Sequence, residues 1–100
     1  MIKEIFAVSD RVKPRTIPEV MLKLQEECGE LATEVGIQVG FLHKTPGNDG
    51  VLGESIDAII CLIDVIRLAY GNSVTPLMIE TKLAEKLAKW EFNDSVRPLQ

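Results

Sequence analysis

The chain has 100 residues, 46% of them hydrophobic and 26% charged, and a formal net charge of −4. This length suits one small domain, residues 1–100, which buries a limited core by itself, so we expect it to self-associate. The negative charge argues against a general nucleic-acid-binding surface, which would be basic.

The first two predicted helices are separated by a proline. A short helix around Ile2–Asp10 should end in the sequence RVKPRT, because Pro14 disfavours helix at the residue before it. The second helix opens at Thr16, which forms a capping box with Glu19 three residues later. Apolar residues then recur on a single helical stripe until the turn-forming sequence HKTPGNDG: Ile17, Met21, Leu24, Cys28, Leu31, Val35, Val39 and Leu42.

Two further helices follow this turn. The third runs from about Val51 to Tyr70 with Gly71 as its C-cap, and it is apolar almost all round, so it should be the most buried element. The fourth opens at Thr75 and Pro76, an N-cap followed by proline, and continues towards Trp90. Strand signals are absent. The predicted fold is therefore all-α, an antiparallel helical bundle of about four helices completed by oligomerisation.

Acidic residues form two pairs on the second and third helices. In QEECGELATE, Glu27 and Glu30 are close neighbours at the edge of the apolar stripe, where like charges repel. Glu54 and Asp57 repeat this spacing on the otherwise apolar third helix. A short connection makes the two helices antiparallel neighbours, so the pairs can face each other. A divalent cation between them would relieve the cost of burying four carboxylates.

The ligand types favour one class of metal. An all-oxygen, carboxylate-rich site suits Mg²⁺, with Mn²⁺ as a possible substitute. A di-iron bundle would instead require histidine three residues after a core glutamate. Glu30 and Asp57 stand at those positions, and the only histidine, His43, is expected at a helix C-terminus. A di-iron site is therefore disfavoured.

The sequence EECGE followed by ESID resembles the EExxE…ExxD signature of the MazG-like all-α nucleoside triphosphate pyrophosphohydrolases, over about Thr16 to Trp90. The resemblance implies hydrolysis of a ribo- or deoxyribonucleoside triphosphate to the monophosphate and pyrophosphate, in a homodimer or homotetramer. It implies metal ligands at Glu27, Glu30, Glu54 and Asp57, and a catalytic base at Glu26 or Glu27. It also implies substrate contacts at Asp64, Lys82, Lys86 and Lys89.

Several alternatives stay open on the sequence alone. Phosphoribosyl-ATP pyrophosphatase is the alternative enzyme, and a non-catalytic metal- or nucleotide-binding helical module is the alternative outside enzymes. Asp64 could pair with a lysine instead of a nucleotide, and the lysines of the fourth helix could form an ordinary amphipathic surface. Glu34 is expected to be an exposed acid or a lysine partner. The base, the sugar, the biological role and the choice between dimer and tetramer are not indicated.

Nothing in the sequence indicates export or a membrane. Charges interrupt the apolar residues of the N-terminal MIKEIFAVSD, unlike a signal peptide. The run AIICLIDVIRLAY is too short to cross a bilayer, and Asp64 and Arg67 interrupt it. Cys28 and Cys61 are far apart without a CxxC spacing and are expected to be small buried residues. We therefore expect a cytoplasmic, reduced protein.

Overall fold

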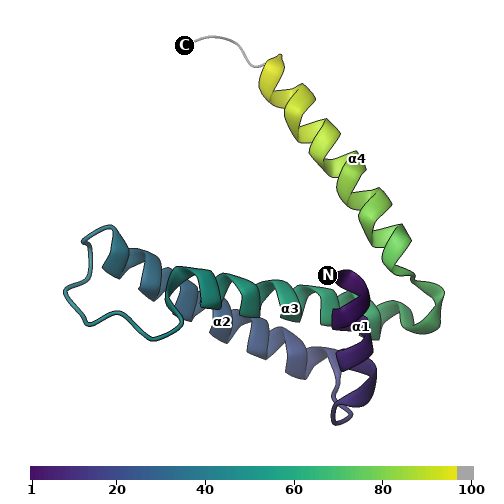
Figure 1. The fold of residues 1–100 in the computed structure, drawn as a ribbon, viewed down its shortest axis with the longest axis horizontal. Helices are drawn as coiled ribbons and strands as arrows, with labels where there is room; N and C mark the ends of the chain where they lie inside the picture. The colour runs from purple at the N-terminus through teal and green to yellow at the C-terminus, as the bar shows by residue number, and fades with distance from the viewer. Residues whose placement is uncertain (97–100) are drawn as a thin grey trace.

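The computed structural model describes residues 1–96, and Figure 1 shows their arrangement. The elements are α1 (Ile2–Arg11), α2 (Ile17–Gln38), α3 (Gly50–Tyr70), the short 3₁₀ helix η1 (Gly71–Ser73) and α4 (Pro76–Ser95). Residues 1–96 contain no strand, which confirms the all-α fold class. Residues 97–100, the end of the predicted domain, lie outside the described part.

The predicted capping signals are present in the structure. The Glu19 amide donates to Thr16 Oγ1 at 3.3 Å, and the Thr16 amide donates to Glu19 Oε1 at 3.2 Å, completing the capping box. Thr75 Oγ1 accepts from the Met78 amide at 3.2 Å at the start of α4. Gly71 follows α3 with a φ of 57°, a conformation that glycine adopts without strain. Local sequence therefore determines these three helix ends.

The end of α2 differs from the prediction. The helix stops at Gln38, short of Leu42, because Gly40 takes a φ of 86° and reverses the chain. The amides of Phe41 and Leu42 then both donate to the Gly36 carbonyl, at 2.8 and 3.0 Å. His43 consequently lies in the exposed α2–α3 loop, so the expectation that it sits at the helix C-terminus is wrong.

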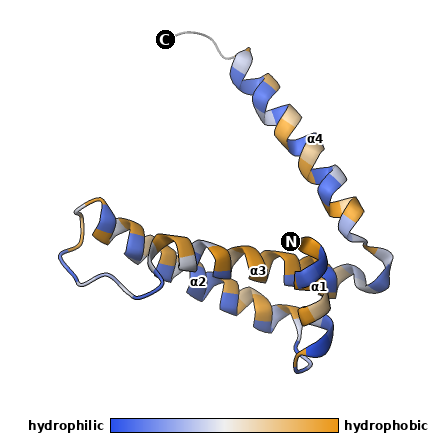
Figure 2. Ribbon diagram, in the orientation of Figure 1, coloured by the Kyte–Doolittle hydropathy of each residue, from blue (hydrophilic) through white to orange (hydrophobic). Residues whose placement is uncertain are grey.

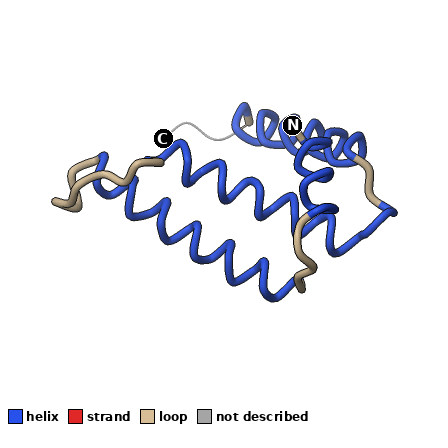
Figure 3. The backbone as a smooth tube through the Cα atoms, turned by 60° about the horizontal axis from the view of Figure 1, so that its bottom comes forward, coloured by secondary structure: helices blue, strands red, loops and turns tan. Residues whose placement is uncertain are grey.

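The central feature is the antiparallel hairpin of α2 and α3, against which α1 packs (Figures 1 and 3). Val20, Ala58 and Cys61 are buried, which confirms the expectation for Cys61. A second cluster joins α1, α3 and the segment before α4 through Ile2, Phe6, Ile63 and Val74. These few residues make up the buried hydrophobic core of the described chain.

Much of the apolar surface is left open. One side of α3 exposes Leu52, Ile59 and Leu62, although the sequence predicts this helix to be buried almost all round. Figure 2 shows hydrophobic residues along the length of α3. Cys28 is also exposed, contrary to the expectation of burial, because the stripe of α2 is wider than the surface that α3 covers.

The last helix departs from the hairpin. In Figure 1, α4 projects away from α2 and α3. It packs beside α1, and Ile79, near its first turn, packs against the core cluster. None of its residues is buried. The four helices are thus present and in contact, but the fourth does not lie alongside the hairpin within one chain.

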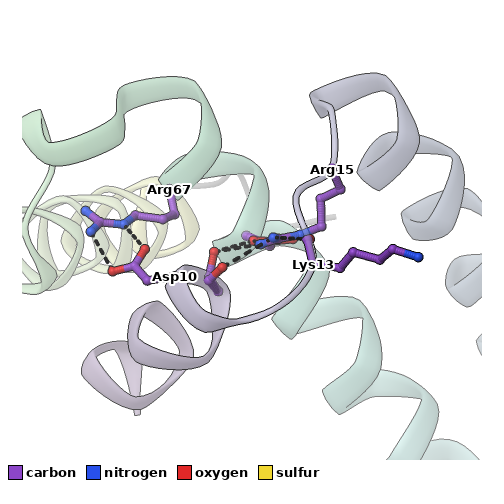
Figure 4. A network of polar contacts seen from close by, with 6 residues as sticks. Asp10, Lys13, Arg15 and Arg67 are labelled. Carbon is purple, nitrogen blue, oxygen red and sulfur yellow. Dashed lines mark hydrogen bonds and ion pairs between the residues drawn. The ribbon is translucent and has the colours of Figure 1, made fainter.

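Polar contacts tie α1 to α3 (Figure 4). Arg67 donates to both carboxylate oxygens of Asp10, from Nε at 2.9 Å and from its second terminal nitrogen at 2.8 Å. It also lies over the ring of Phe6, 4.9 Å from the centroid, and donates to the Gly71 carbonyl. The hydrogen bond from Arg67 lowers the pKa of Asp10 below its usual value. Arg67 therefore fixes α1 and the end of α3 together.

Among the described helices, none combines the length and the apolar character that a membrane crossing requires.

Candidate metal centre

The hairpin brings carboxylates of α2 and α3 into two overlapping groups. The first contains Glu27, Glu30 and Glu54, and the second contains Asp49, Glu54 and Asp57. Within each group, one oxygen from every residue lies within 4.8 Å of the others. Glu54 belongs to both groups and joins the acids of the two helices. The structure therefore contains acidic clusters that could hold a metal ion, at the positions of the predicted ligands.

Glu27 is the most buried charged residue of the described chain, with 4% of its surface exposed. Its Oε1 forms an ion pair with Lys23 Nζ at 3.0 Å, one helical turn earlier, and this hydrogen bond lowers the pKa of Glu27. Its Oε2 is buried with no hydrogen-bond partner, and so is Oε2 of Glu54. Buried polar atoms are nearly always paired in folded proteins, so two unpaired carboxylate oxygens in one cluster require an explanation.

Glu54 is the member of the cluster whose ionisation is opposed by its surroundings. Burial first, and then the neighbouring carboxylates of Glu30, Glu27 and Asp57, raise its pKa to about 7. Part of the Glu54 population therefore stays protonated at neutral pH. A cation bound between the acids would stabilise the ionised form and remove the cause of this shift.

Sequence reasoning missed Asp49. It precedes α3 as the N-cap residue, but its side chain does not cap the helix and instead joins Glu54 and Asp57. A Cβ added to Gly53 would lie 2.4 Å from Asp49 Cβ, so the absence of a side chain at Gly53 makes room for Asp49. The available signal was an aspartate directly before Gly50, at a position where carboxylates are favoured.

Two other glutamates of α2 lie outside these groups. Glu26 is exposed, and one of its oxygens lies 3.8 Å from Lys23 Nζ. Glu34 accepts a hydrogen bond from the Gly47 amide at 2.8 Å and so holds the α2–α3 loop against α2. A Cβ on Gly47 would lie 2.6 Å from Glu34 Oε1, so a side chain at this position would displace the carboxylate. Glu34 is thus a loop anchor rather than the free acid or lysine partner expected from the sequence.

Asp64 accepts hydrogen bonds from residues outside the α2–α3 hairpin. Ser9 Oγ donates to Asp64 Oδ1 at 2.6 Å and Arg15 Nε donates to Oδ2 at 2.9 Å, with a further contact from the same guanidinium to Oδ1. Burial raises the pKa of Asp64, but the hydrogen bonds from Arg15 and Ser9 outweigh it and leave the pKa lowered. The alternative of a lysine partner is wrong, because the loop between α1 and α2 supplies an arginine. Figure 4 shows Arg15 in this network.

Within one chain, the lysines predicted to contact substrate do not lie beside the carboxylates. Lys82 pairs with Glu85 on the same helix at 2.9 Å, and Lys86 and Lys89 are exposed. Because α4 lies near α1 and the C-terminal end of α3, and projects away from the hairpin, it holds these lysines apart from the acidic clusters of its own chain.

Comparison with protein-family models, curated proteins and solved structures gives no match for this chain. The resemblance to the MazG-like enzymes therefore rests on the carboxylate motif and the all-α fold.

Proposed function

We propose that this protein is a Mg²⁺-dependent nucleoside triphosphate pyrophosphohydrolase of the MazG-like kind. The observation that carries the proposal is the pair of buried, unpartnered oxygens on Glu27 and Glu54, within one cluster of carboxylates. Such an arrangement is unfavourable in the absence of a cation, because burial and mutual repulsion both oppose ionisation. It becomes favourable when a divalent ion is shared between the acids.

The proposed ligands are those predicted from the motif, Glu27, Glu30, Glu54 and Asp57, with Asp49 added by the structure. All are carboxylates, a donor set that favours Mg²⁺ or Mn²⁺. When bound, Mg²⁺ supplies neutralisation of the phosphate oxygens and a lowered pKa for a coordinated water.

Two glutamates are our candidates for accepting the proton of the attacking water. In the proposed reaction, the water oxygen forms a bond to the α-phosphorus, and the bond from that phosphorus to the bridging oxygen of pyrophosphate breaks. Glu27 is held ionised by Lys23, whereas Glu26 is exposed beside the same lysine. Either carboxylate could accept the proton. Glu26 is the more accessible of the two, since Glu27 already accepts from Lys23.

Substrate binding would use residues outside the acidic clusters. Lys82, Lys86 and Lys89 would neutralise the charge that develops on the departing pyrophosphate. Their separation from the cluster within one chain means that the α4 of a second copy would have to supply them. Arg15 and Ser9 use three of the roughly four acceptor sites of Asp64, so we propose that it mainly positions the α1–α2 loop.

The decisive experiment is product analysis on each ribo- and deoxyribonucleoside triphosphate, with Mg²⁺ and with EDTA. The expected products are the monophosphate and pyrophosphate, formed only with metal. Glu30→Ala and Asp57→Ala should abolish turnover with helicity preserved, whereas Glu80→Ala, an exposed acid on α4, should leave it unchanged. Turnover retained in both cluster variants would refute the site.

Other products would identify a different function. Release of orthophosphate would indicate another phosphatase chemistry, and turnover of phosphoribosyl-ATP alone would favour the second enzyme predicted from the sequence. Absence of turnover on every compound, combined with Mg²⁺ binding by calorimetry, would favour a metal- or nucleotide-binding module.

A further inference from the structure

Glu34 continues the line of acidic residues on α2 but lies outside both acidic clusters. It follows Glu30 by four residues, so the two side chains are neighbours on one side of the helix. It is half-buried, and its Oε1 accepts a hydrogen bond from the Gly47 amide at 2.8 Å. The last acid of this line therefore binds the backbone of the α2–α3 loop, whereas Glu27 and Glu30 cluster with Glu54 of α3.

This hydrogen bond is close in the chain to Asp49. Only Asn48 separates Gly47 from Asp49, and a step of two residues spans at most about 7 Å. Pro46, with its fixed φ, directly precedes Gly47, so the chain on the other side of the hydrogen bond is stiff as well. A fixed Gly47 amide consequently restricts where the Asp49 side chain can lie.

A second set of contacts holds the other end of the same loop. The amides of Phe41 and Leu42 donate to the Gly36 carbonyl at 2.8 and 3.0 Å. The Leu42 side chain also covers Gly36, where an added Cβ would lie 3.0 Å from Leu42 Cδ1. The loop is thus attached to α2 on both sides of residues 43–46. Glu34 supplies the attachment at the end that leads into α3.

The first turn of α3 is weak by itself. Asp49 is its N-cap residue, but the Asp49 carboxylate makes no capping hydrogen bond and lies with Glu54 and Asp57 instead. The turn also contains Gly50 and Gly53, and glycine is a poor helix former. Helix ends fray readily when few contacts hold them. The helix end that presents Asp49 to the cluster therefore depends on an attachment from outside α3.

We propose that Glu34 is a positioning residue for the metal centre. By holding the Gly47 amide, it keeps Asp49 beside Glu54 and Asp57, where the three carboxylates would hold a cation. Glu34 is not itself assigned as a ligand, because its Oε1 is used by the loop and the residue belongs to neither cluster. The role rests on the metal site of the proposed function and is independent of nucleotide hydrolysis.

Positioning and simple charge attraction make different demands on the Glu34 side chain. Positioning requires an oxygen that accepts from the Gly47 amide, whereas attraction of a cation requires a negative charge. Glu34→Gln keeps the acceptor oxygen and removes the charge, and Glu34→Ala removes both. Gly47→Ala changes no carboxylate, but its Cβ would lie 2.6 Å from Glu34 Oε1 and would disrupt the contact from the loop side.

The test is titration calorimetry with Mn²⁺ on the full chain. Glu34→Ala and Gly47→Ala should each reduce the affinity by about tenfold, the effect expected when a group that orients a metal ligand is lost. Glu34→Gln should bind Mn²⁺ as tightly as the wild type, because the hydrogen bond to the loop is retained. Glu80→Ala, which removes an exposed acid on α4, is the control and should also leave the affinity unchanged.

A double variant tests whether Glu34 acts through Asp49. In the Asp49→Asn background, Glu34→Ala should cause no further loss of Mn²⁺ affinity, because the residue that it positions no longer supplies a carboxylate. Two losses that multiply in the double variant would mean that the residues act independently, which would overturn the proposal. Unchanged affinity in Asp49→Asn alone would overturn it as well.

Further outcomes separate this role from the metal site and from the activity. A wild-type chain that binds no Mn²⁺ would reject the metal centre and the positioning role together. Wild-type affinity in Glu34→Ala, even with a lower Tm, or an equal loss in Glu34→Gln and Glu34→Ala, would reject the positioning role alone. Gly47→Ala decides the question if Glu34→Ala does not fold. The expected affinities without any nucleotide turnover would support the role and reject only the activity.

Discussion

Glu27 on α2 and Glu54 on α3 meet across the hairpin, and each leaves one buried carboxylate oxygen without a hydrogen-bond partner. Lys23 forms its ion pair with the other oxygen of Glu27, Oε1. Glu54 has no basic partner among the described residues, and its pKa rises to about 7. The pKa values of the two residues are therefore shifted in opposite directions, and that difference makes the cluster testable without any substrate.

Stabilisation by Mg²⁺ should increase with pH through about 7. The pKa of Glu54 is 4.5 when unperturbed and about 7 in the folded chain, so the folded state holds the extra proton between these values. Stability contributed by this group consequently falls as pH rises from 4.5 to 7. Bound Mg²⁺ removes the penalty, so the Mg²⁺-induced rise in Tm should be small at pH 5.5 and larger at pH 8. An equal Mg²⁺ effect at both values would argue against cation binding at Glu54.

Glu54→Gln should stabilise the protein at pH 8 without metal, and should stabilise it less at pH 5.5. The amide has the shape of the carboxyl group but cannot ionise, so the repulsion from Glu30 and Glu27 is removed. The same variant should lose most of the Mg²⁺-induced Tm shift. Melting curves at both pH values, with Mg²⁺ and with EDTA, check both statements. Glu80→Gln on α4 serves as the control.

Gly53→Ala should weaken metal binding. Alanine has a higher helix propensity than glycine by roughly 0.5–1 kcal/mol, but the added Cβ would lie 2.4 Å from Asp49 Cβ. The start of α3 must therefore shift, which offsets the gain in propensity and displaces Asp49 from the cluster. Calorimetry with Mn²⁺ should show affinity reduced by about tenfold, similar to Asp49→Asn. Unchanged affinity in both variants would remove Asp49 from the site.

Lys23→Gln should make the protein more dependent on Mg²⁺. Loss of the 3.0 Å ion pair leaves Glu27 with a buried charge and no basic partner. Tm in EDTA should fall, and the rise in Tm produced by Mg²⁺ should exceed that of the wild type. Lys3→Gln is a suitable control, since Lys3 is an exposed lysine on α1. A smaller Mg²⁺ effect in Lys23→Gln would indicate that Lys23 is part of the binding site.

Phe6→Ala should destabilise the fold by about 3 kcal/mol. Phe6 is 6% exposed in the cluster with Ile63 and its ring supports the guanidinium of Arg67, so truncation leaves a cavity and removes a cation–π contact. Urea unfolding monitored by circular dichroism measures the loss. Val8→Ala, at a residue 48% exposed on the same helix, should cost much less. A comparable cost for both would mean that α1 is buried by an association partner.

Local signals in the sequence predict most helix ends correctly. Thr16 with Glu19, Thr75 before Pro76, and Gly71 after Tyr70 act through hydrogen bonds or backbone angles of neighbouring residues, so they need no tertiary information. The end of α2 is less predictable. The apolar stripe continues to Leu42, but Gly40 reverses the chain and its conformation depends on the amide–carbonyl contacts with Gly36.

The residues of the acidic site were likewise only partly predictable from the sequence. The spacing of Glu27, Glu30, Glu54 and Asp57 on two helices joined by a short loop is enough to predict that their carboxylates gather. Asp49 is different, since only the turn at Gly50 and the space over Gly53 direct its side chain into the cluster. The partner of Asp64 likewise depends on how α1 and its following loop pack, which no local pattern specifies.

The sequence by itself determined the helices, their order and the acidic pairs, because capping, periodicity and short loops act over a few residues. Only the tertiary structure decided that Arg15 holds Asp64, that Glu34 anchors the loop at Gly47, and that the lysines of α4 stand apart from the carboxylates. These outcomes depend on contacts between residues far apart in the chain, which capping and periodicity do not specify. For the same reason the sequence does not reveal that α4 extends from the hairpin with its leucines exposed, although α3 also has exposed apolar residues.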